Sequence, residues 1–113
     1  MTPNEYQKLA MRTASNTHWT DKAFELLNPV LGMCGESGEI ADMLKKHIHQ
    51  GHPLDTDKLC RELGDVLWYI ALGCTVLDKT LEEIMQMNID KLKARYPDGF
   101  DPERSLHRAE GDT

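Results

Sequence analysis

The sequence predicts an all-α protein, a bundle of four to five helices. Apolar residues recur every three or four positions through most of the chain, which is the helical period, whereas the alternation typical of strands is nearly absent. Two segments begin with the capping-box pattern T-x-x-E, at Thr2 and at Thr80. Several prolines and glycines fall between or after the periodic segments, where helices are expected to end: Gly51, Pro53, Pro97, Gly99, Pro102 and Gly111.

The first helix is expected to begin at Thr2, whose capping box is followed by a proline at the first helical position. Residues 15–20 are polar and are predicted to form a loop. The second helical stretch runs from about residue 21 to residue 49. Pro29 lies inside it and is expected to break or kink the helix, because proline lacks an N–H and clashes with the preceding turn.

A third helix is expected over residues 57–77, and a fourth from Thr80 to just before Pro97. Residues 98–113 are polar, and with Pro97 just before them the segment has two prolines and two glycines, Pro97, Gly99, Pro102 and Gly111. We therefore expect a helical domain over residues 1–97 and a polar tail over 98–113, extended on the surface or disordered.

Composition restricts the classes of function. A chain of 113 residues fits one domain, and its formal net charge of −6 argues against a basic face that holds a nucleic-acid polymer. No run approaches the roughly 18 apolar residues of a membrane span, so no membrane partner is expected. The three cysteines are odd in number and lie in apolar runs, which predicts reduced, buried thiols and a cytoplasmic protein.

Two pairs of carboxylates carry the chemistry, Glu36-x-x-Glu39 on the second helix and Glu62-x-x-Asp65 on the third. Spacing of i, i+3 places each pair on one helical face, where like charges repel. The ordinary explanation of such carboxylate pairs is that each lies on a helical face exposed to solvent. Between Glu62 and Leu77, however, Asp65 is the one other charged residue, so the third helix is apolar nearly all round and is predicted to be buried.

Buried carboxylates that converge need a cation to offset their repulsion. If residues 34–48 and 58–76 pack antiparallel, the two pairs meet across the seam between the helices. Ligands that are all oxygen favour Mg²⁺, Mn²⁺ or Ca²⁺ over Zn²⁺. The pattern therefore predicts a Mg²⁺ site, with Mn²⁺ as a possible substitute.

The fourth helix carries an amide and two cations on or beside its apolar stripe. Asn88 lies in the middle of the stripe, and Lys91 and Arg95 flank it. A satisfied core amide and snorkelling surface charges are the ordinary explanations. Beside a metal–carboxylate layer, the same residues are candidates for binding phosphate.

Aromatic and histidine residues offer weaker candidates. Trp19 lies in a polar loop and is the best candidate for a contact with a base, whereas Trp68 and Tyr69 are expected to pack in the core. Three histidines cluster near the end of the second helix, but their spacing does not favour zinc: His47, His49 and His52.

The carboxylate runs resemble those of the MazG-like all-α nucleoside triphosphate pyrophosphohydrolases, whose pattern is E-E-x-x-E followed by E-x-x-D on the next helix. The resemblance covers roughly residues 30–100 and rests on three runs: Gly35-Glu36-Ser37-Gly38-Glu39, Glu62-Leu63-Gly64-Asp65, and Asn88-x-x-Lys91-x-x-x-Arg95-Tyr96-Pro97. It implies hydrolysis of nucleoside triphosphates, with deoxynucleotides favoured, to a monophosphate and pyrophosphate. It also implies a homodimer or a dimer of dimers that completes the bundle, which suits a third helix with two apolar faces.

The resemblance assigns roles by position. Glu36, Glu39, Glu62 and Asp65 would hold Mg²⁺; Asn88, Lys91 and, more weakly, Arg95 would contact the triphosphate, and Lys91 would also stabilise charge on the leaving group.

One position departs from the pattern, because Gly35 stands where the family has the first glutamate. The two candidates for the general base are then Glu39 and a hydroxide held by the metal. A phosphoribosyl-ATP pyrophosphohydrolase is the alternative enzyme, and a non-catalytic module for nucleotide sensing or assembly is the alternative that Gly35 favours.

Overall fold

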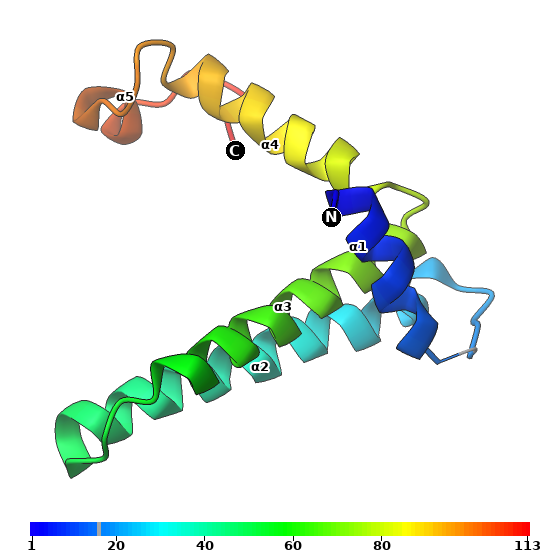
Figure 1. Cartoon of the computed structure of the whole chain (residues 1–113). Coiled ribbons are helices and arrows are strands. Elements are labelled where there is room, and N and C mark those ends of the chain that lie inside the picture. Colours follow the sequence, from blue (N-terminus) through cyan, green and yellow to red (C-terminus); the bar gives the residue numbers. More distant parts are fainter. Residues whose placement is uncertain (16) are drawn as a thin grey trace.

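The computed structural model describes residues 1–15 and 17–113, and over these residues the regular structure is helical (Figure 1). The all-α prediction is confirmed. The elements in chain order are α1 (Pro3–Ala10), the 3₁₀ turn η1 (Met11–Thr13), α2 (Lys22–Gln50), α3 (Thr56–Val76), α4 (Leu81–Arg95) and α5 (Pro102–Leu106).

A long antiparallel hairpin of α2 and α3 forms the framework of the molecule (Figure 1). Gly51 ends α2 in the left-handed conformation at φ 73°, which glycine adopts without steric cost. Asp55 begins α3, because its carboxylate accepts a hydrogen bond of 2.9 Å from the backbone N–H of Lys58. Residues 34–48 and 58–76 therefore pack antiparallel, which is the condition under which the two carboxylate pairs can meet.

Pro29 does not break α2, so the expected break is wrong. The helix continues unbroken from Lys22 to Gln50. Pro29 is fully buried, and its side chain faces α3 at Gly73, where an added Cβ would lie 3.7 Å from the proline. The helix loses one backbone hydrogen bond at Pro29, and burial of the ring against α3 offsets that loss.

Polar anchors fix α1 against the hairpin. The indole N–H of Trp68 donates to the Ala10 carbonyl and to the Thr13 hydroxyl, each at 3.0 Å. The amide of Gln7 accepts from the backbone N–H of Leu81 at 2.7 Å, which holds the start of α4. Among the described residues, the buried ones are Ala10, Pro29, Ala71, Cys74 and Leu81.

Large apolar surfaces stay uncovered in the single chain. The radius of gyration is 17.3 Å, against about 13 Å for a compact chain of this length. Beyond its first turn α4 projects away from the hairpin (Figure 1). On α3, Leu63 is 53% exposed and Leu67 is 39% exposed, so the expectation of a helix buried all round is wrong for one chain.

The cysteines also differ from expectation. Cys74 is buried, but Cys34 and Cys60 are exposed, because the faces of α2 and α3 that carry them have no neighbour in the chain. All three thiols are free. Within the described residues, no helix is long and apolar enough to cross a membrane.

The C-terminal segment folds back onto α4. A short helix, α5, interrupts it, so it is neither wholly extended nor disordered as expected. The guanidinium of Arg95 donates two hydrogen bonds to the Asp112 carboxylate, at 2.8 and 2.7 Å, and only 10% and 14% of the two side chains are exposed. This ion pair lowers the pKa of Asp112. The division into a domain over 1–97 and a tail over 98–113 stays a prediction.

Candidate metal centre

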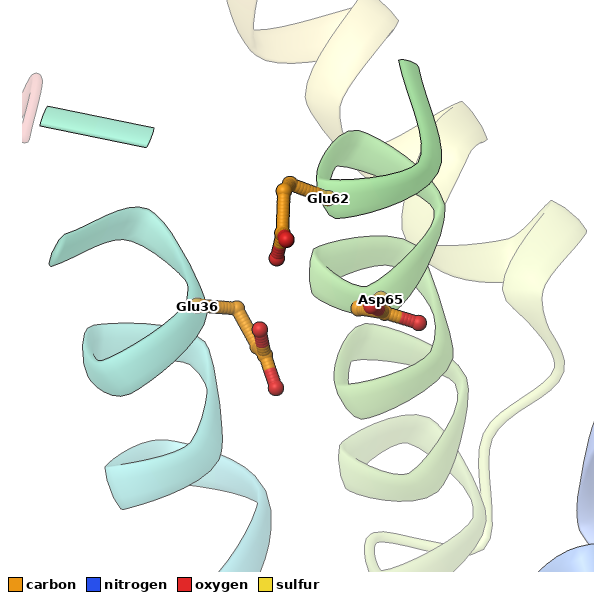
Figure 2. A group of neighbouring side chains, drawn as sticks. All are labelled: Glu36, Glu62 and Asp65. Atoms are coloured by element: carbon orange, nitrogen blue, oxygen red, sulfur yellow. The ribbon is translucent and has the colours of Figure 1, made fainter. Parts of the chain in front are cut away.

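Three of the four predicted carboxylates converge between α2 and α3. Glu36 extends from α2, and Glu62 and Asp65 extend from successive turns of α3 (Figure 2). One oxygen from each side chain lies within 4.8 Å of the others. The i, i+3 spacing on α3 and the antiparallel packing of the hairpin produce this arrangement.

The environment of Glu62 fits a cation. Glu36 and Glu62 are half-buried, and Asp65 is exposed. The Oε2 atom of Glu62 is buried and has no hydrogen-bond partner. An unpartnered carboxylate oxygen is costly to bury, and a divalent cation would supply its missing partner. Because every donor atom is a carboxylate oxygen, the set suits a hard cation such as Mg²⁺ or Mn²⁺.

Glu39 lies beside this group but outside the three converging oxygens. The carboxyl group of Glu62 lies close to that of Glu39 and raises the pKa of Glu39, first through this contact and further through its charge. The ammonium of Lys58 acts in the opposite direction. The close approach of two carboxyl groups indicates that negative charge is concentrated here, and the ligand role of Glu39 stays a prediction.

A glycine sets the separation of the two helices next to the carboxylates. The aromatic ring of Tyr69 lies directly against Gly32, in the space where a Cβ would be. Gly32 is one turn before Glu36, and Tyr69 is one turn after Asp65. Their contact therefore fixes how closely the helices approach at the metal site. Gly35, by contrast, has nothing within 4 Å of an added Cβ.

One cavity of about 640 Å³ extends from the carboxylates toward the loop of the hairpin. Its lining contains acidic and basic side chains from both helices. They are Glu39, Asp42 and Lys46 of α2, Lys58 and Glu62 of α3, and Asp55 at the start of α3.

A second cavity of about 710 Å³ lies at the other end of the hairpin. Trp19 lines it, is 56% exposed, and stacks on Phe24 with ring centroids 5.8 Å apart. Trp68 and Tyr69 instead pack edge to face at 5.0 Å within the structure, as expected. The exposed stacked pair leaves an aromatic face at this cavity that a planar ligand could cover.

The predicted phosphate-binding residues of α4 are not brought to the carboxylates within one chain. The helix α4 projects away from the hairpin (Figure 1). Asn88 and Lys91 are exposed on it, and Arg95 forms an ion pair with Asp112. Asn88 is therefore not a core amide in the single chain. Of the histidines, His47 contacts the backbone carbonyl of His52 through Nδ1 at 2.7 Å.

Sequence reasoning missed the two lysines of the first cavity. Lys58 precedes Glu62 by four residues, and Lys46 follows Glu39 by seven. Both spacings return to the same helical face, which was the available signal. The lysines had no distinguishing feature, because most lysines at helical positions are solvated.

Comparison with known proteins agrees with this geometry. The model of the family described as the MazG nucleotide pyrophosphohydrolase domain matches residues 24–100, a range that contains all four carboxylates. The Gene 37 protein of Mycobacterium phage L5 is 40% identical over 73 residues, which are 61% of this chain and 64% of that relative. The chain thus spans less than two thirds of the relative's length. No solved structure matches the chain. The match over most of the helical region, together with the converging carboxylates, shows that the chain belongs to the MazG nucleotide pyrophosphohydrolase domain family.

Proposed function

We propose that this protein hydrolyses nucleoside triphosphates between the α and β phosphorus atoms, in a reaction that requires Mg²⁺. Deoxynucleoside triphosphates are the expected substrates. The observation that carries the proposal is the buried, unpartnered Oε2 atom of Glu62, which lies among converging carboxylates beside a cavity. A purely structural cluster would have no reason to leave that oxygen without a partner.

The carboxylates divide into two roles in this proposal. Glu36, Glu62 and Asp65 hold the ion, with Glu39 as a further ligand. Mg²⁺, when bound, supplies charge neutralisation and polarises the phosphoryl oxygens of the substrate. Glu39 lies outside the three-oxygen group, so one of its carboxylate oxygens would bind the ion while the other accepts the proton of the attacking water. Gly35 supplies no side chain that could compete for this role.

The aromatic face at the second cavity supports a role in holding the base. Trp19 and its neighbour Phe24 are both more than half exposed, which is unfavourable unless a ligand or partner covers them. Trp19 is therefore the proposed base contact. Within α2, the Asn28 position at this cavity is eight residues before Glu36, about 12 Å along the helix axis.

A second copy of the chain is the proposed source of Asn88 and Lys91 in the complete site. The helix that carries them projects away from the hairpin (Figure 1). Large apolar side chains on α3 and α4 are exposed, among them Leu63, Met87 and Ile89. A homodimer or a dimer of dimers would cover these surfaces. We expect light scattering at micromolar concentration to show at least a dimer. An active, strictly monomeric protein would contradict this expectation.

The position of bond cleavage tests the proposed reaction. In ¹⁸O-labelled water, we expect the label in the nucleoside monophosphate and none in pyrophosphate, because attack occurs at the α phosphorus. Products should be measured with and without Mg²⁺ across ribo- and deoxynucleotides and phosphoribosyl-ATP.

The same measurement separates the alternatives. Turnover confined to phosphoribosyl-ATP would favour the alternative enzyme. Binding of nucleotides without turnover would favour a sensing module. Gly35 is the reason to test this alternative, because it replaces a glutamate of the family pattern. Release of inorganic phosphate and a diphosphate would exclude a pyrophosphohydrolase.

A further inference from the structure

We propose that the hairpin end of the first cavity binds the β and γ phosphates of the substrate, and hence the leaving pyrophosphate, through Lys58 and Lys46. This inference rests on the proposed function for the identity of the substrate. It adds two residues of the same chain that the resemblance did not assign.

The lysines and the carboxylates share one cavity. Glu39, Glu62, Lys46 and Lys58 all line it. Lys58 is one helical turn before Glu62, about 6 Å along the axis of α3, and Lys46 is two turns after Glu39, about 10 Å along α2. Because the helices run antiparallel, both displacements lead toward the hairpin loop. A phosphate chain that begins at the carboxylates would meet Lys58 first and Lys46 next.

The charges at this end of the cavity suit an anion. Asp42 accepts from Lys45 at 3.2 Å and from Lys46 at 2.8 Å, so one carboxylate holds two ammonium groups and leaves one positive charge in excess. Within the described part of the chain, the Lys58 ammonium forms no salt bridge. Asp55 also lines the cavity and keeps its negative charge, so the hairpin end has one positive charge in excess, from Lys45, Lys46 and Lys58 against Asp42 and Asp55.

The test uses the full-length protein and pyrophosphate as the probe. The double variant Lys46→Ala, Lys58→Ala is compared with Lys45→Ala. The control also removes a positive charge that pairs with Asp42, but Lys45 does not line the cavity. Calorimetry in Mn²⁺ measures pyrophosphate binding, and paramagnetic resonance measures binding of Mn²⁺ alone. We expect the double variant to bind pyrophosphate at least about 10-fold more weakly, since charge-assisted hydrogen bonds to phosphate are lost. Its affinity for Mn²⁺ should stay within about twofold of wild type, because the metal ligands are unchanged.

Each outcome decides the inference. Equal pyrophosphate binding by wild type, double variant and control, with all three folded by thermal melting, would overturn it. So would an equal loss in Lys45→Ala, which would reduce the effect to net charge. Loss confined to the double variant supports the subsite. Pyrophosphate binding that depends on the lysines, in a wild-type protein that hydrolyses no triphosphate, would support the subsite and exclude the proposed function.

Discussion

Glu62→Gln is expected to abolish pyrophosphate release, by more than about 100-fold, since loss of even a residue that orients a ligand typically costs 10–100-fold. The substitution keeps the size of the side chain but removes its charge and replaces one carboxylate oxygen with an NH₂ group that cannot bind a cation. In the wild type, Mg²⁺ should raise the melting temperature, because it binds the native state alone. In Glu62→Gln that rise should be largely lost. Steady-state kinetics and melting curves with and without Mg²⁺ measure both effects.

Without metal, the same variant should be at least as stable as wild type. The carboxyl groups of Glu39 and Glu62 approach closely, and removal of one charge relieves their repulsion. Glu82→Gln is the matched control, because Glu82 is exposed on the first turn of α4, far along the sequence from the cluster. The control should keep its activity and its response to Mg²⁺. Full turnover by Glu62→Gln in Mg²⁺ would remove Glu62 from the site.

The helices were predictable because the signals that form them are local. The capping boxes at Thr2 and Thr80 are both present in the structure, with each hydroxyl accepting from the N–H three residues later at 3.1 Å. The carboxylate pairs were predictable for the same reason, since spacing alone places each pair on one face. The meeting of Glu36 with the α3 carboxylates required only that the hairpin be antiparallel.

The features that sequence reasoning missed depend on contacts between distant residues. Pro29 was expected to break or kink the helix on local grounds, but it lies within an unbroken α2 and packs against α3 at Gly73. Arg95 was assigned to phosphate, and its partner Asp112 lies 17 residues away in a segment expected to be unstructured. The exposed apolar faces of α3 and α4 have a similar origin, because the sequence does not say whether one chain or two cover an apolar face.

The contact between Gly32 and Tyr69 leads to the second large prediction, Gly32→Ala. A methyl group at Gly32 would overlap the Tyr69 ring, so the ring or the helix must move. Overpacking of this kind costs about 1–3 kcal/mol, of which alanine's better helix propensity returns up to about 1 kcal/mol. Gly35→Ala is the control, because its methyl group meets open space and should stabilise the protein by about 0.5–1 kcal/mol. Denaturant unfolding should separate the two variants by about 2 kcal/mol.

The same pair of variants connects helix packing with metal binding. Gly32 and Tyr69 lie one turn from Glu36 and Asp65, so a wider separation at this contact also moves the carboxylates apart. Mn²⁺ affinity should therefore fall in Gly32→Ala and stay near wild type in Gly35→Ala. The double variant Gly32→Ala, Tyr69→Leu removes the overlap and should recover part of both losses, because substitutions at contacting residues are not additive. Equal stability and equal Mn²⁺ affinity in Gly32→Ala and Gly35→Ala would show that this contact does not set the spacing of the carboxylates.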